Sequence, residues 1–224
     1  MKEAEKPMTE QESLALITNM INRAKDVNHS TGLTSIMWGL VIITCSLVRL
    51  AEIHYDFKMP FDIYLLTVLA VAPTIYFSIK EKKERHVTGY KDSFIDNTWL
   101  AFGISIFLLS FIMNVLFANL RPLKDSVELA TGKNLVHFMY EYMAAFFLML
   151  YGLPTFITGT SMKFKPMIWG GIICWVSCLA AIYTTVKIDL LLTAISALFA
   201  WFIPGLILEK DYRKAKKELG ASHV

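Results

Sequence analysis

Several features that are common in enzymes are missing from this sequence. The three cysteines, Cys45, Cys174 and Cys178, form no CxxC pair and no His/Cys spacing typical of a metal site, so neither a disulfide framework nor a zinc module is predicted. The HExxH and GxSxG motifs are absent, and so is a glycine-rich phosphate loop. The sequence therefore predicts no catalytic residue, no bound metal and no cofactor.

Charged residues are also scarce, at 18% of the chain, whereas soluble domains average about a quarter. Hydrophobic residues make up 55%. Six stretches approach the roughly 20 apolar residues that a helix needs to cross a hydrocarbon core about 30 Å thick. They cover residues 33–53, 61–80, 97–118, 135–160, 166–186 and 188–208. Because they lack the alternating pattern of barrel strands, we predict an all-α polytopic bundle of six transmembrane helices.

The positions of the basic residues predict how this bundle is oriented. If the N-terminus lies inside, sixteen of the 22 lysines and arginines fall on the cytoplasmic side and six on the other. The positive-inside rule then favours cytoplasmic termini at both ends. We divide the chain into a cytoplasmic N-terminal segment (1–32), a transmembrane domain (33–208) and a charged cytoplasmic tail (209–224). The basic clusters are interpreted as topology signals and lipid headgroup contacts, not as nucleic-acid sites.

The N-terminal segment is expected to contain an amphipathic helix over residues 9–27. Thr9 followed by Glu12 forms a capping box, and apolar residues then recur at helical spacing. This helix is too polar to span, so it packs under the bundle, lies on the membrane surface or binds a partner. The first 30 residues lack the apolar core of a cleavable signal peptide, so the first span is expected to act as its own insertion signal.

The six predicted spans resemble three hairpins. Each odd-numbered span opens with a tryptophan near a glycine, and each even-numbered span has a proline near its cytoplasmic end. Trp38 and Pro73 are 35 residues apart, as are Trp169 and Pro204, while an outer loop over 119–134 lengthens the middle hairpin. Such repeats are common in transporters, but they also arise simply because two-helix units insert well. The prolines are expected to kink their helices.

Small residues recur four apart in two of the spans. Gly170, Cys174 and Cys178 do so in the fifth span, and Ser196, Ala200 and Pro204 form a similar stripe in the sixth. Small residues at this spacing let neighbouring helices approach closely. We therefore interpret these cysteines as packing residues and not as ligands.

An intramembrane polar cluster is the clearest functional candidate. Charges inside spans are costly and usually face the bundle interior. The predicted orientation puts Arg49, Asn114 and Glu141 at similar depth in the outer half of the membrane. Glu52 shares a helix face with Arg49, and His137 shares a helix face with Glu141. We hypothesise that Arg49 and Glu141 form an ion pair. On the simpler interpretation the pair only joins two helices, and Glu52 and His137 are solvated.

Two weaker alternatives involve the same region. His54 and Asp56 with His137 and Glu141 could hold a metal, although their spacing matches no recognised ligand pattern. The aromatic residues of the fourth span could line a lipid or drug pocket, although such rings more often face lipid or core. Asp92, Asp96 and Asn97 begin the third span and are expected to complement its helix N-terminus.

Three segments resemble a known family in their pattern. They are "EQESLALITNMINRAK" at 10–25, "SMKFKPMIWGGIICW" at 161–175 and "AWFIPGLILEKDY" at 200–212. Together they resemble an uncharacterised family of small bacterial six-helix integral membrane proteins. The resemblance implies a multi-pass protein of the bacterial inner membrane, and it carries no catalytic residues to transfer.

We expect a non-enzymatic inner-membrane protein, sensory or accessory, that acts through a cytoplasmic protein partner at residues 9–27 or at the C-terminal tail. One alternative is a small transporter or channel for an ion or small molecule that uses the Arg49–Glu141 region. Another is a membrane enzyme that acts on lipid. The lipid bilayer is the predicted environment, no nucleic-acid partner is expected, and the pattern specifies no oligomeric state.

Overall fold

The structure, a computed structural model, describes residues 32–84, 90–132 and 135–221, and positions 9, 11, 13 and 14. These residues are helical or lie in short connections, and none of them forms a strand. The helix predicted over 9–27 lies almost entirely outside the described residues. Within its one described turn, the Ser13 N–H donates to the Thr9 carbonyl at 2.9 Å.

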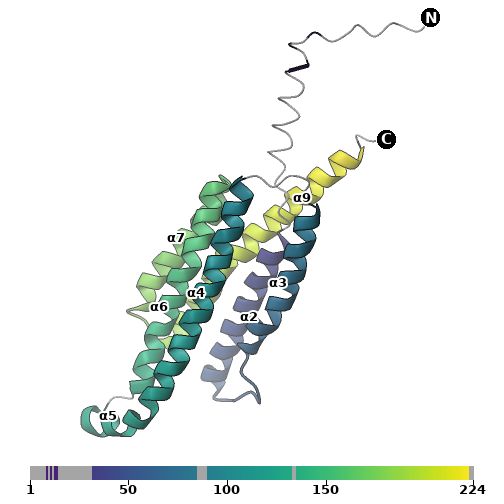
Figure 1. Cartoon of the computed structure of the whole chain (residues 1–224). Coiled ribbons are helices and arrows are strands. Elements are labelled where there is room, and N and C mark those ends of the chain that lie inside the picture. The colour runs from purple at the N-terminus through teal and green to yellow at the C-terminus, as the bar shows by residue number, and fades with distance from the viewer. Residues whose placement is uncertain are drawn as a thin grey trace, which may run out of the picture.

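The long helices lie side by side with their axes roughly aligned (Figure 1). They are α2 (Leu33–Tyr55), α3 (Leu65–Glu84), α4 (Tyr90–Leu120), α6 (Leu135–Ser161), α7 (Lys165–Ala181), α8 (Val186–Ala197) and α9 (Ile203–Ala221). A π-helical segment, η2 (Leu198–Phe202), joins α8 to α9 without a break. The connection from α4 to α6 contains the 3-10 turn η1 (Arg121–Leu123) and the short helix α5 (Lys124–Thr131), where only a loop was predicted.

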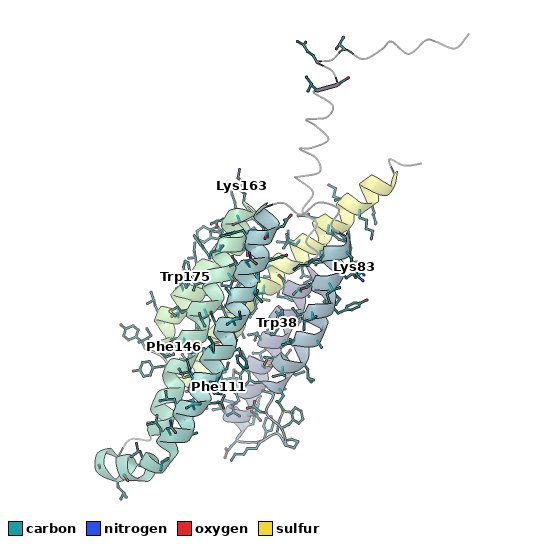
Figure 2. The ribbon with its side chains drawn as sticks, viewed as in Figure 1. Trp38, Lys83, Phe111, Phe146, Lys163 and Trp175 are labelled. Carbon is teal, nitrogen blue, oxygen red and sulfur yellow. The ribbon has the colours of Figure 1, made fainter. Side chains whose placement is uncertain are left out.

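The two ends of the bundle are distinct. The α2–α3 connection and α5 lie at one end, which we call the α5 end (Figure 1). The C-terminal part of α9 projects at the other, which we call the α9 end, and Lys83 and Lys163 lie there too (Figure 2). α2, α3, α4, α6, α7 and the continuous α8–η2–α9 stretch therefore alternate in direction, as expected for hairpins that cross a membrane.

Four described helices are long and apolar enough to cross a membrane: Leu33–Tyr55, Asp92–Leu120, Tyr142–Ser161 and Val186–Lys217. Two of the six predicted spans fall short. α7 has 17 residues, which is about 25 Å at 1.5 Å per residue. α3 begins at Leu65 and not at residue 61, since the chain before it forms turns, and its last residues are charged. The structure thus describes an all-helical protein with four clear candidate spans.

The centre of the bundle is built from α2, α6, α7 and the α8–η2 segment. α6 and α7 form the most extensive contact, and α2 packs along α8 and η2. α3 lies mainly against α2, and α4 lies mainly against α6. Ile42, Leu148, Cys174 and Trp201 are buried where the central helices meet. α3 and α4 are therefore peripheral helices of a four-element core.

The predicted stripes of small residues are packing surfaces. A Cβ atom added at Gly170 of α7 would lie 2.5 Å from the Cα of Ala200 in η2. At Gly39 of α2, an added Cβ would lie 2.9 Å from the Cα of Phe202. Cys174 and Ser196 are buried in the same region. The absence of side chains at the two glycines lets α2 and α7 approach the η2 backbone from two sides.

The prolines lie inside helices as expected, and one coincides with altered helical geometry. Pro73 lies within α3 and Pro154 within α6. Pro204 is the second residue of α9 and follows the π-helical segment η2 directly. Proline lacks an N–H and its ring clashes with the carbonyl four residues earlier. The wider turn of η2 relieves that clash while the helix continues.

Candidate functional site

The first polar group lies at the α5 end of α2. Arg49 Nη1 lies 2.8 Å from Glu52 Oε2, and the other carboxylate oxygen of Glu52 accepts the Met59 N–H at 3.0 Å. The Glu52 side chain is 8% exposed, against 47% for Arg49. The expectation that Glu52 is solvated is therefore wrong. Its carboxylate fastens the α2–α3 connection to the end of α2.

The remaining members of the predicted cluster do not join this pair among the described contacts. The side chains of His137 and Glu141 lie outside the described residues, so an Arg49–Glu141 ion pair stays a prediction. Asn114 is exposed on α4, and its amide donates to the Ser110 carbonyl of the same helix at 2.9 Å. Of the five predicted residues, described contacts bring together Arg49 and Glu52.

A second acidic residue, Asp189, was not predicted from the sequence. It lies in the first turn of α8 and is 2% exposed. Its carboxylate accepts a hydrogen bond from the Thr184 hydroxyl, and Thr193, one turn further along, donates to the Asp189 carbonyl at 2.8 Å. Ser196 follows on the same side of α8 and is fully buried. These side chains form a buried polar stripe along a candidate span.

Asp189 was missed because it lies beside a predicted span boundary at 186–188. An aspartate in a first helical turn ordinarily complements the helix dipole at the water interface. Burial depends on the neighbouring helices, which the sequence does not specify. One signal was available, because an ionisable residue inside an apolar run marks a functional candidate by default.

Tryptophan–threonine hydrogen bonds connect the helices at mid-bundle. The indole N–H of Trp201 in η2 donates to Thr155 of α6 at 2.9 Å, and that of Trp99 in α4 donates to Thr158 at 3.0 Å. The Tyr151 and Trp201 rings pack with centroids 4.8 Å apart. The peripheral helix α4 and the central segment η2 are thereby both hydrogen-bonded to α6. Tyr151, one of the aromatic residues of the fourth predicted span, is thus a core residue and not part of an open pocket.

Charged groups mark the α9 end. Lys82 of α3 lies 3.6 Å from Asp96 of α4, so Asp96 pairs with a neighbouring helix, while Asp92 occupies the first turn of α4. In α9, Arg213 pairs with Glu209 at 2.6 Å. The helix carries further basic residues beyond this pair, at Lys210, Lys214, Lys216 and Lys217. The last part of α9 therefore presents a charged helical surface outside the bundle (Figure 1).

A shallow groove of about 430 Å³ opens between α2 and α8 at the α5 end. Its walls include Leu47, Leu50 and Leu191, and its polar rim is formed by His54 and Lys187. Within the described parts of the chain, no group of three or more His, Cys, Asp or Glu side chains is placed to hold a metal ion. The chemistry that the described groups offer is hydrogen bonding and ion pairing.

Comparisons of this chain with protein-family models, with curated proteins and with solved structures found no match. The roles of its residues are therefore argued from their own contacts. Three features carry those roles: the Arg49–Glu52 pair, the buried stripe that begins at Asp189, and the tryptophan–threonine bonds around η2.

Proposed function

We propose that the chain crosses the bacterial inner membrane six times, with both termini in the cytoplasm. The alternating direction of α2, α3, α4, α6, α7 and the α8–α9 stretch supports this topology, because consecutive spans cross a membrane in opposite directions. The basic residues support the orientation, since Lys83, Lys163 and the lysines of α9 gather at the α9 end (Figure 2). The bonds Trp38–Thr74 and Trp99–Thr158, each from an odd to an even span, are compatible with repeated hairpins.

As its function we propose a non-enzymatic, sensory or accessory role exercised through a cytoplasmic protein partner. The observation that carries this proposal is the continuity of the last helical stretch, Val186–Lys217. It begins at Val186, carries the buried Asp189 in its first turn, passes the core at Trp201 and leaves the bundle as a charged helix. A rigid helix of this kind transmits a displacement of the bundle to whatever binds its exposed end.

The exposed part of α9 fits a protein partner better than lipid alone. Residues 209–217 carry five basic side chains and two acidic ones, Glu209 and Asp211, and Lys210, Asp211 and Arg213 are exposed. Lipid headgroups of the inner leaflet would attract the lysines but repel Asp211. A partner with mixed charges can satisfy both signs, which provides specificity and register.

A photo-crosslinking residue introduced at Lys214 tests this role in living cells. We expect one covalent adduct of constant mass, formed with the full-length protein in its membrane. The matched control places the same residue at Ser126, an exposed position of α5 at the opposite end. An absence of adducts at Lys214, or an identical pattern at both positions, would contradict a partner on α9.

A second candidate function, a carrier for a small ion, is favoured by one observation. Asp189, Thr193 and Ser196 place buried oxygen atoms along one candidate span. Intramembrane acids commonly mark ion or proton pathways. This alternative predicts that Asp189→Asn abolishes ion flux into liposomes while the matched, exposed Asp211→Asn leaves it unchanged. Equal flux in both variants would remove this candidate.

A further inference from the structure

α4 presents an apolar face that its own bundle does not cover. None of the residues in its candidate membrane window is buried. The exposed surface is wide and includes Leu108, Ile112 and Val115. Within it, one set of exposed residues recurs at alternating spacings of three and four: Asn97, Leu100, Ile104, Phe107, Phe111, Asn114 and Ala118. This is the seven-residue repeat of a helix that packs along a second helix. We call these seven residues the α4 heptad face.

The bundle uses a different side of α4. Trp99, Phe102 and Ile106 pack against the core. At 3.6 residues per turn, Trp99 and Ile106 lie about 100° around the helix from Leu100 and Phe107, their neighbours on the heptad face. The two largest rings of the heptad face, Phe107 and Phe111, are 69% and 60% exposed, and Figure 2 marks Phe111 on the α5-end half of α4. The heptad face is thus available while α4 remains attached to α6.

Asn114 distinguishes this face from one that only contacts lipid. The side-chain NH₂ group of Asn114 donates to the Ser110 carbonyl of its own helix. Among the described residues, no donor is hydrogen-bonded to the side-chain oxygen of Asn114. The apolar part of α4 is centred near Leu108, so Asn114 lies about 9 Å from its middle, inside a hydrocarbon core about 30 Å thick. A carboxamide there gains free energy when it bonds a polar group on another helix.

We propose that the α4 heptad face is the interface of a homodimer in the membrane. Copies inserted by the same signals share one orientation, so a two-fold axis must run along the membrane normal. The two α4 helices are then parallel, and each position of the heptad face meets its own equivalent. Asn114 therefore opposes Asn114, and an asparagine offers both the donor and the acceptor that such a pair requires.

This self-complementarity indicates that the partner of the α4 heptad face is a second copy of the same chain. A second copy supplies apolar rings against Phe107 and Phe111, and it supplies an amide against Asn114 at the same depth. Asn97 meets its equivalent at the other end of the face, about 25 Å away along the helix. Two polar pairs at the ends of an apolar seam determine the register of the helices. The proposal requires that α4 crosses the membrane, and it is independent of any cytoplasmic partner.

Dimerisation of the purified full-length protein in lipid vesicles, measured by energy transfer between two fluorophore-labelled populations, tests the interface. We expect the wild-type protein to dimerise and Asn114→Leu to weaken the dimer about tenfold. The matched control, Asn119→Leu, changes the same residue type on the same helix at an exposed position off the heptad face, and it should dimerise as the wild type does. Circular dichroism verifies that both variants fold.

Oxidative crosslinking locates the contact, with single cysteines introduced into a chain whose native Cys45, Cys174 and Cys178 are replaced by alanine. Phe107→Cys should form a disulfide-linked dimer in native membranes, whereas Ile106→Cys, on the bundle side, should not. A monomeric wild-type protein, an Asn114→Leu variant that dimerises like wild type, or equal crosslinking at both positions would overturn the proposal. A failed Lys214 crosslink would leave these results unchanged, so the two proposals fail separately.

Discussion

At the scale of single residues, small side chains decide how closely the helices of this bundle pack. Gly170 and Gly39 meet the η2 backbone at distances that exclude even a methyl group. Gly103, by contrast, lies on the open side of α4, where an added Cβ would meet no atom within 4 Å. Gly39 and Gly170 thus serve close packing and Gly103 does not, a difference that depends on the neighbouring helix and not on the local sequence.

This difference gives a matched pair of variants. We expect Gly170→Ala to destabilise the folded bundle by about 1–3 kcal/mol, because the new methyl group must displace the Ala200 backbone. Gly103→Ala should not destabilise it, since alanine is the better helix former and the space is open. Thermal unfolding of both variants in the same detergent measures this. A lower melting temperature for Gly103→Ala than for Gly170→Ala would contradict the described packing.

The Glu52 carboxylate provides the second residue-scale prediction. Glu52→Ala should accelerate hydrogen exchange at the Met59 amide about tenfold or more, because a hydrogen bond to a charged acceptor contributes roughly 1.5–3 kcal/mol. Glu52→Gln retains an acceptor oxygen for that amide and should have a smaller effect. Exchange followed by mass spectrometry over residues 56–64 is the measurement. Unchanged exchange in Glu52→Ala would show that the carboxylate does not hold the connection.

The sequence alone could identify Arg49 and Glu52 as neighbours, because residues three apart share a helix face. It could not show that the second oxygen of Glu52 binds Met59, since that contact depends on how the chain turns after α2. Asp189 illustrates the same limit, because its burial depends on helices far away in the sequence. Asn114 was predicted to be a polar residue inside the membrane. Whether it faces the bundle or points away from it could not be assigned, because that depends on how α4 packs.

At the scale of elements, most helix positions followed from hydropathy. The first and fourth predicted spans begin where α2 and α6 begin and end within two residues of them. The second was placed too early, because Phe61 and Tyr64 extend an apolar run through what are turns in the structure. Hydropathy records only whether residues are apolar, so it could not distinguish those turns, nor reveal α5 or the π-helical η2.

η2 is coupled to α6 through one buried hydrogen bond, and a double-mutant cycle measures that coupling. Thr155→Val leaves the buried Trp201 N–H without its acceptor and should cost about 1–3 kcal/mol. Trp201→Phe should also destabilise the bundle. The double variant should lose less than the two single losses together, by about 1 kcal/mol, because the shared bond is counted once. Strictly additive losses in chemical unfolding would contradict a direct coupling between these elements.

At the scale of the whole molecule, the account rests on a division between its two ends. Basic residues gather at the α9 end, while the Arg49–Glu52 pair and α5 lie at the other. The last helix spans the distance between them and continues outward with its charges exposed. Partner binding at α9 and transmission through η2 require that the bundle crosses the membrane in this orientation, whereas dimerisation along α4 requires only that α4 crosses it.

Labelling of introduced cysteines by a membrane-impermeant maleimide in intact cells tests that orientation most directly. The three positions are Ser126→Cys in α5, Lys163→Cys between α6 and α7, and Lys214→Cys in α9, all at exposed sites. The six-pass topology predicts that Ser126→Cys is labelled from outside, whereas Lys163→Cys and Lys214→Cys react only after the membrane is permeabilised. Labelling of Lys163→Cys or Lys214→Cys in intact cells, or protection of Ser126→Cys, would contradict it.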